Sequence, residues 1–177
     1  MFEEVLHTLS ISNAIDSIIV VSQDSKVFEI ARKFNVIEIQ DKESGVNNAV
    51  ALADDYLGKH SFDASIVFPQ DIPFMKTQDI DFLLKYQALP SCALIVPSRK
   101  FDGTNSLLRM PTSLMETHYD EDSYKIHLSV GQKTTKNTSL VFIRRIMMDI
   151  DDNDDLAYCL KQNEKPDLCS KITQLLK

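Results

Sequence analysis

Residues 64–75 read Ala-Ser-Ile-Val-Phe-Pro-Gln-Asp-Ile-Pro-Phe-Met, and this stretch decides how the rest of the chain is interpreted. The apolar run over residues 64–68 predicts a short buried strand, which Pro69 ends because proline cannot continue a central strand. Asp71 follows between Pro69 and Pro73, and both prolines stiffen the backbone. We therefore expect a lone carboxylate at the carboxyl end of a strand, where open α/β sheets bind ligands. The stretch alone fits an ordinary strand-to-helix turn with a solvated aspartate equally well.

Helical and strand patterns alternate on both sides of this stretch. Apolar spacing predicts helices over residues 2–9, 25–34, 46–57, 78–89, 124–130, 156–160 and 167–176. Short apolar runs predict strands over residues 16–21, 36–39, 64–68, 92–96, 106–110 and 140–144. Thr77 and Ser123 are each placed to cap the helix that follows. Strands alternating with helices form mostly parallel sheets, so we expect one α/β domain over residues 1–177, a three-layer α/β/α sandwich.

The composition excludes several classes of function. The 177 residues are 44% hydrophobic and 25% charged, which is typical of a globular domain. The formal net charge of −7 argues against a nucleic-acid partner, which usually requires a basic surface. No apolar run approaches the roughly 18 residues that cross a bilayer, so we expect no membrane partner. The first residues, Met1 to Glu4, carry no basic and apolar regions typical of a signal peptide.

Cysteine and glycine narrow the choice further. The three cysteines, Cys92, Cys159 and Cys169, form no CxxC pair and indicate core thiols in a reducing, cytoplasmic compartment. The chain has four glycines and neither a GxGxxG nor a GxxxxGK[ST] motif. A Rossmann dinucleotide site and a P-loop are therefore not expected.

A dense acidic run covers residues 149–155. It is not an EF-hand loop, because Asp154 and Leu160 occupy the positions that require glycine and glutamate. Asp149 and Asp151 point to the same side of an extended segment, because side chains alternate along it. The later acids, Asp152, Asp154 and Asp155, fall where a helix starts and complement its dipole.

Asp71, Asp149 and Asp151 together would form an all-oxygen site, which suits Mg²⁺ or Mn²⁺. A hard metal beside an anionic ligand usually serves phosphoryl or nucleotidyl transfer. Spacing by itself, however, favours a solvated acidic helix start over a metal site.

Two polar segments are candidates for ligand binding. Residues 102–105, Asp-Gly-Thr-Asn, offer hydroxyl, amide and backbone N–H donors in a tight turn, which would cradle a phosphate or carboxylate. Most such tetrapeptides are only turns. Asn47 and Asn48 lie in the first turn of a predicted helix, where asparagine is a good hydrogen-bonding residue.

Five segments in this order resemble the 2-phospho-L-lactate guanylyltransferases, which act in the biosynthesis of the deazaflavin coenzyme F(420). The segments are residues 45–49, 69–73, 102–108, 123–127 and 149–156. The resemblance extends from Met1 to about Leu160. It implies a nucleotide-diphospho-sugar transferase-like fold, which is a Rossmann-like sandwich. It also implies that a phosphate oxygen of 2-phospho-L-lactate, or of phosphoenolpyruvate, attacks the α-phosphorus of GTP and that pyrophosphate leaves.

The resemblance also implies roles for individual residues. The metal-binding and catalytic acids would be Asp71, Asp149 and Asp151, with Mg²⁺ or Mn²⁺ as the cofactor. The nucleotide-binding residues would be Gly45, Asn47, Asn48 and Pro69. The residues that bind the phospho-acid would be Thr104, Asn105 and Ser123. The partners are then GTP and a small phospho-acid, and a homodimer is a possible assembly.

Two departures from the family pattern stand out. The family begins with a strand and a Lys/Arg-bearing loop that wraps the triphosphate, whereas the helix predicted over residues 2–9 begins without a cap or a preceding strand. We therefore expect weak or no activity from this chain as it stands. The family usually has glycine three residues before the serine that matches Ser123, and here that position is Asp120. A carboxylate there is expected to repel a bound phosphate.

Two other readings remain open. One is another nucleotidyltransferase of the same fold, of the molybdenum-cofactor guanylyltransferase or sugar-phosphate cytidylyltransferase type; the segment over residues 102–108 argues against it. The other is a truncated, non-catalytic nucleotide-binding relative, and the retained acids Asp71, Asp149 and Asp151 argue against that.

Overall fold

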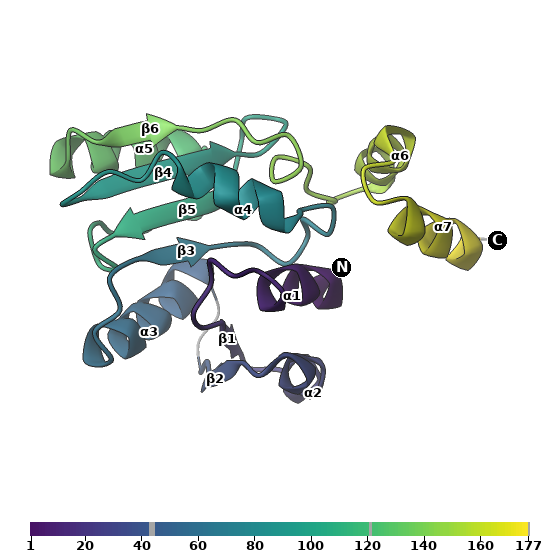
Figure 1. The fold of residues 1–177 in the computed structure, drawn as a ribbon, viewed down its shortest axis with the longest axis horizontal. Helices are drawn as coiled ribbons and strands as arrows, with labels where there is room; N and C mark the ends of the chain where they lie inside the picture. Colours follow the sequence, from purple (N-terminus) through teal and green to yellow (C-terminus); the bar gives the residue numbers. More distant parts are fainter. Residues whose placement is uncertain (43–44, 121, 177) are drawn as a thin grey trace.

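A computed structural model describes residues 1–42, 45–120 and 122–176 (Figure 1). The helices are α1 (Phe2–Ser10), α2 (Ser25–Ala31), the 3-10 turn η1 (Arg32–Phe34), α3 (Val46–Lys59), α4 (Thr77–Leu84), α5 (Ser123–Thr134), α6 (Asn153–Gln162) and α7 (Pro166–Leu175). The strands are β1 (Ile19–Ser22), β2 (Ile37–Gln40), β3 (Ser65–Val67), β4 (Cys92–Pro97), β5 (Thr104–Met110) and β6 (Thr138–Leu140).

The described strands form two sheets. β1 and β2 pair in parallel, and a four-stranded sheet has the order β3-β5-β4-β6. In the larger sheet β5 runs antiparallel to β3 and β4, whereas β4 and β6 are parallel. Helix α4 covers one face of this sheet and α5 the other (Figure 1). The predicted three-layer α/β fold is confirmed, with β5 as the reversed strand.

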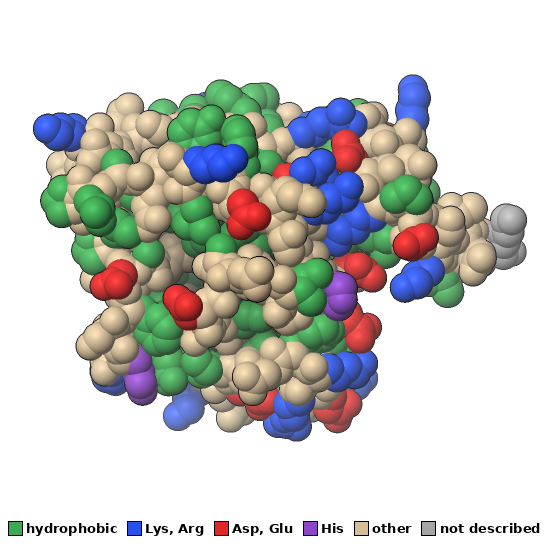
Figure 2. Space-filling model, in the orientation of Figure 1, with side chains coloured by type: hydrophobic (Ala, Val, Ile, Leu, Met, Phe, Trp, Pro, Cys, Tyr) green, Lys and Arg blue, Asp and Glu red, His purple; other side chains and the backbone are tan. Residues whose placement is uncertain are grey.

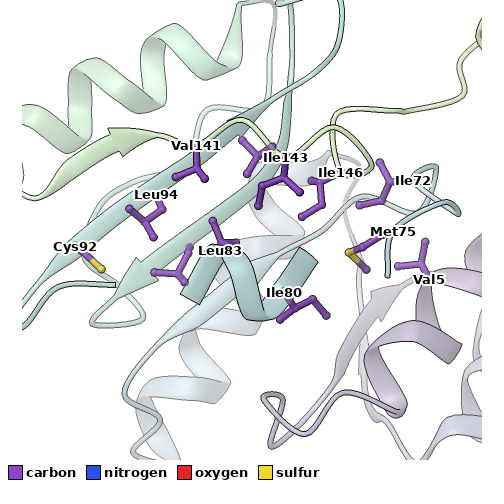
Figure 3. Packing of buried hydrophobic residues seen from close by; sticks show 12 residues of the cluster. Val5, Ile72, Met75, Ile80, Leu83, Cys92, Leu94, Val141, Ile143 and Ile146 are labelled. Carbon is purple, nitrogen blue, oxygen red and sulfur yellow. The ribbon is translucent and has the colours of Figure 1, made fainter. Parts of the chain in front are cut away.

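Strand β4 divides its side chains between the two layers of the core. Leu94 and Val96 belong to the cluster that packs against α4, with Ile80 and Leu83 (Figure 3). The alternate residues Ala93 and Ile95 belong to the cluster on the α5 side. All six residues of β4 are buried, as expected of a strand covered on both faces.

The predicted bounds differ from the structure by up to four residues at several elements, for example at β1 and α6, and most at two others. Helix α4 ends at Leu84, not at residue 89. Tight turns follow, in which the N–H groups of residues 85–87 each donate to the carbonyl three residues earlier. Residues 140–144 do not form a strand; β6 ends at Leu140. The N–H of Val141 still donates to Ile95 O (2.8 Å), and the pairing stops there because β4 ends at Pro97.

The two predicted caps were also wrong. Thr77 is the first residue of α4, and the cap is supplied by Asp79, whose Oδ2 accepts from the N–H of Lys76 (2.8 Å). Asp122 holds the cap position of α5, and the Ser123 hydroxyl bonds a distant strand instead. The acidic start of α6 was predicted correctly, because Asp152 accepts from the N–H groups of the next turn.

Helices α6 and α7 lie beside one end of the sheet and bury Cys159 and Cys169 against Phe74 and Met148 (Figure 1). The three cysteines are free and buried, as predicted for core thiols. Figure 2 shows Lys and Arg side chains gathered next to α6, with Asp and Glu close by. No helix in the described ranges combines the length and apolar character that crossing a membrane requires.

A cavity of about 890 Å³ lies between the two sheets. Its walls include β1, β3 and the inner face of α3, together with Asp54 and Arg109. Arg109 is 1% exposed, and its guanidinium donates to both carboxylate oxygens of Asp54 at 2.7 and 2.6 Å. None of the three acids singled out in the sequence lines this cavity.

Candidate functional site

The structure brings Asp71 and the segment before α6 together. Asp71 follows β3 and the Pro69 turn, and its carbonyl accepts a hydrogen bond from the N–H of Ile150 (3.0 Å). Asp149 and Asp151 flank Ile150. Asp71 and Asp149 are half-buried, whereas Asp151 is exposed. Two chain segments about eighty residues apart thus place three carboxylates in one region.

These carboxylates destabilise one another when charged. Burial raises the pKa of Asp71, and repulsion from Asp151 adds to that rise. Burial also raises the pKa of Asp149 to about 6, with smaller contributions from the charges of Asp151 and Asp71. The Oδ1 atom of Asp71 is buried and accepts no hydrogen bond from any residue that the structure describes. Half-buried, mutually repelling carboxylates with an unpartnered oxygen are the groups that a bound cation would stabilise.

These carboxylates suit a magnesium ion that also binds water and substrate phosphates better than a metal ion held by protein side chains alone. In residues 1–42, 45–120 and 122–176, no group of three or more His, Cys, Asp or Glu side chains is arranged to hold a metal. Mg²⁺, however, usually binds through one or two carboxylates, waters and substrate phosphates. Half-buried carboxylates with an unsatisfied oxygen meet that requirement. The assignment of the metal to Asp71, Asp149 and Asp151 stays a prediction.

Asp155 was predicted only to complement the dipole at the start of a helix, but in the structure it also forms ion pairs. Its carboxylate is 2% exposed and pairs with Arg99 Nη2 (2.6 Å) and Lys100 Nζ (2.8 Å). It also accepts from the backbone N–H of Asp151 (3.3 Å), which fixes the acidic segment. The ion pair with Asp155 raises the pKa values of both basic groups.

Sequence reasoning missed these two cations. Arg99 and Lys100 follow one residue after the end of β4, at the same edge of the sheet as the acids, and that position is the signal that could have identified them. The charge of Asp149 contributes to the raised pKa of Arg99, so the guanidinium lies within electrostatic reach of the acids.

Thr104 and Ser123, the predicted phospho-acid residues, are brought together. Ser123 Oγ lies 3.0 Å from Thr104 Oγ1, and both residues are buried. Thr104 Oγ1 also lies 2.9 Å from Nδ1 of His127, which is fully buried. The four histidines show no spacing of metal ligands in the sequence; the only signal for His127 was its place in the segment 123–127.

Asn105 connects the strand to the acids. Its side-chain amide donates to the carbonyl of Ile146 (3.0 Å). The same amide lies close enough to the Asp149 carboxylate to oppose the rise in the pKa of that acid. Asn105 therefore serves the acidic segment in this structure. The pairing of β4 with β5 shifts register here, because Val96 pairs with Ser106 but Pro97 with Thr104, so Asn105 is the extra residue of a β-bulge. Thr104 bonds His127 on α5, whereas Asn105 bonds Ile146 in the segment before the acids.

The backbone of the turn over residues 102–105 is not the anion cradle that the sequence suggested. The N–H groups of Asp102 and Gly103 both point at Ser98 Oγ, at 3.2 and 3.1 Å. Ser98 in turn donates to the Asp102 carboxylate at 2.6 Å. The turn satisfies its own donors, which leaves the side chains of Thr104 and Asn105 as its polar contribution.

The predicted nucleotide residues lie at the start of α3 and after β3. Gly45 precedes α3 with φ of 116°, a conformation that glycine adopts readily. Asn47 Oδ1 accepts from the N–H of Tyr119 (2.7 Å), and Asn48 Nδ2 lies 3.4 Å from Asp41 Oδ1. Pro69 is half-buried beside Asp71.

Asp120, which departs from the family pattern, is exposed to solvent. An exposed carboxylate is screened by water and salt, so its effect on a bound phosphate is smaller than that of a buried one.

The family model described as "Guanylyl transferase CofC like" matches residues 2–165. A phosphoenolpyruvate guanylyltransferase from Conexibacter woesei is 27% identical over 158 residues, which cover 88% of this chain and 71% of that protein. A 2-phospho-L-lactate guanylyltransferase from Methanocaldococcus fervens is 30% identical over 141 residues, 79% of this chain and 62% of that protein.

Solved structures support the same fold. A structure described as a nucleotide-diphospho-sugar transferase from Desulfovibrio desulfuricans superposes with a TM-score of 0.67 at 15% identity, covering 92% of this chain and 72% of that chain. A cytidylyltransferase from Leptospira borgpetersenii gives 0.62 at 16% identity, covering 88% of this chain and 71% of that chain. At these identities the likeness concerns the fold alone.

Proposed function

The chain belongs to the family of CofC-like guanylyl transferases, and from that premise we propose that it joins GTP to a small phospho-acid in coenzyme F(420) biosynthesis. The acceptor is 2-phospho-L-lactate or phosphoenolpyruvate, the substrates named for its relatives. A phosphate oxygen of the acceptor forms a bond to the α-phosphorus of GTP. The bond from that phosphorus to the bridging oxygen breaks, and pyrophosphate leaves.

The observation that carries this proposal is the half-buried pair Asp71 and Asp149, with raised pKa values and an unpartnered Oδ1 on Asp71. Together with Asp151 these carboxylates would hold Mg²⁺ or Mn²⁺. The bound ion would supply positive charge that offsets the charge building on the α-phosphate.

The remaining residues divide the work of binding. Asn105 orients the Asp149 carboxylate, and Asp155 fixes the backbone of Asp151. Arg99 and Lys100 supply positive charge beside the acids in a chain whose net charge is −7. Thr104 and Ser123 offer hydroxyl groups to the phospho-acid. Gly45, Asn47, Asn48 and Pro69 form the proposed nucleotide side of the site.

The first test is binding, measured by calorimetry with GTP and Mg²⁺ and then with phosphoenolpyruvate or 2-phospho-L-lactate. We expect GTP to bind in the presence of Mg²⁺ and much more weakly in EDTA. CTP is expected to bind more weakly than GTP. Release of pyrophosphate from GTP in the presence of each acceptor then tests the chemistry and identifies the acceptor.

Asp71→Asn is the informative variant, and Asp81→Asn on the exposed face of α4 is its matched control. Both substitutions remove one negative charge. Only Asp71→Asn is expected to abolish the dependence of GTP binding on Mg²⁺. Equal Mg²⁺ dependence in the two variants would refute the metal assignment, and tighter binding of CTP than GTP would favour a cytidylyltransferase.

The finer assignments follow from the same reasoning. The free, buried cysteines support a reducing compartment, and we place the enzyme in the cytoplasm. A homodimer is part of this proposal, and sedimentation analysis would test it.

A further inference from the structure

We infer that His127 is a positioning residue, which fixes the hydroxyl pair of Thr104 and Ser123 so that it offers one hydrogen-bond donor to the phospho-acid. The inference rests on the proposed function of that site. It starts from the contacts of one buried imidazole ring. The ring of His127, on α5, contacts both β5 and the residues that precede α5.

The backbone determines the tautomer of His127. Its Nε2 atom lies 2.8 Å from the backbone N of His118, whose N–H can only donate. Nε2 is therefore the acceptor, so in the neutral ring the proton sits on Nδ1. Burial, the main cause, lowers the pKa of His127 to about 4, which keeps the ring neutral near pH 7.

The tautomer sets the polarity of the hydroxyl pair. Nδ1–H donates to Thr104 Oγ1 at 2.9 Å, so the threonine oxygen is an acceptor from the ring. A second hydrogen bond joins Thr104 and Ser123 at 3.0 Å. Only one of the two hydroxyl protons is used in that bond. In the described structure, neither hydroxyl has a further acceptor, so one proton remains for a ligand.

This arrangement selects an anionic ligand. The opposite tautomer would accept a hydrogen bond from Thr104 and would leave the pair with no proton to offer. A phosphate or carboxylate is acceptor-only at neutral pH and requires donors. Hydrogen bonds from hydroxyl groups to such anions are stronger than neutral ones. The two hydroxyl groups can each donate or accept a hydrogen bond, and the neutral histidine leaves one of them as a donor to the ligand. It does so without placing a positive charge in the core.

The ring is itself held in place. Tyr119 packs edge-on against it, with 4.8 Å between ring centroids, and the Tyr119 N–H donates to Asn47 Oδ1 at 2.7 Å. Residues 118 and 119 are therefore anchored by His127 on one side and by α3 on the other. Residues 118 and 119 therefore connect the hydroxyl groups proposed to bind the phospho-acid with the proposed nucleotide side of the site.

Nitrogen-edited NMR of the imidazole rings at pH 7 tests the tautomer directly. We expect His127 as the neutral Nδ1–H form, identified by loss of its signals in His127→Asn. A protonated ring or an Nε2–H tautomer would overturn the inference, whatever the protein binds.

Calorimetry with phosphoenolpyruvate tests the function of the ring. His127→Leu removes both polar contacts and is expected to weaken binding about tenfold or more, the loss of one hydrogen bond to a charged group. His127→Asn can place an amide N–H near the Nδ1 position and is expected to restore most of the affinity. GTP affinity should change little in either variant. Melting temperatures verify that both variants fold.

A double-mutant cycle separates positioning from general support of the fold. In a Thr104→Val background, His127→Leu is expected to have little further effect on phosphoenolpyruvate binding, because the imidazole acts through the Thr104 hydroxyl. Equal losses in both backgrounds would overturn the inference and leave His127 a structural residue. A wild type that binds neither GTP–Mg²⁺ nor phosphoenolpyruvate would overturn the proposed function and the donor role together.

Discussion

Asp149→Asn should make the metal-free protein more stable at neutral pH. The Asp149 carboxyl has a pKa of about 6 in the folded protein against an ordinary value of 3.8, mainly because it is buried. The folded state therefore binds more protons than the unfolded state between these two pH values, and stability falls as pH rises through them. Asparagine has nearly the same shape and avoids this cost.

The magnitude follows from the shift. Two pKa units correspond to about 3 kcal/mol at most, since one unit is 1.36 kcal/mol. Asp149 is half-buried, so we expect about 1–3 kcal/mol at pH 7.5, or a rise in melting temperature of about 2–9 °C for a chain of this size. The gain should shrink strongly by pH 4 and vanish below the ordinary pKa of 3.8, where the carboxyl is protonated in both the folded and the unfolded protein.

Urea unfolding in EDTA from pH 4 to pH 8 measures the effect. Asp63→Asn is the control, because Asp63 is exposed and its replacement changes the net charge equally. Mg²⁺ should stabilise the wild type more than Asp149→Asn. The reasoning fails if Asp149→Asn gains no stability at pH 7.5, or if the gain is the same at pH 4.

Two further predictions concern the frame around the site. Asp54→Asn should cost about 3 kcal/mol of unfolding free energy by urea titration, because Arg109 is 1% exposed and would lose its charged partner; a loss under 1 kcal/mol would contradict this. Gly131→Ala should cost about 1–3 kcal/mol, since the new Cβ would lie 2.7 Å from Thr138 Cγ2. Gly58→Ala, with nothing within 4 Å, should instead stabilise α3 by up to about 1 kcal/mol. Thermal melts compare the two, and equal effects would refute the packing argument.

The sequence determined most of the local structure. Apolar periodicity located α1, α3 and the buried strand β4, because the spacing of buried positions depends only on backbone geometry. Prolines after β3 and the acidic start of α6 were equally local signals. The order of the polar segments along the chain was sufficient to identify the family, and the match over residues 2–165 confirms it.

The tertiary structure decided which groups meet. Asp155 resembled its neighbours in the acidic run, yet it is the buried partner of Arg99 and Lys100. Ser123 resembled a helix cap, yet its hydroxyl bonds a strand nineteen residues earlier. The reversal of β5 likewise has no signature in its own residues. Local patterns report which face of an element is buried, but pairing across the sheet depends on contacts between distant segments, and the chain chooses these only when the whole core closes.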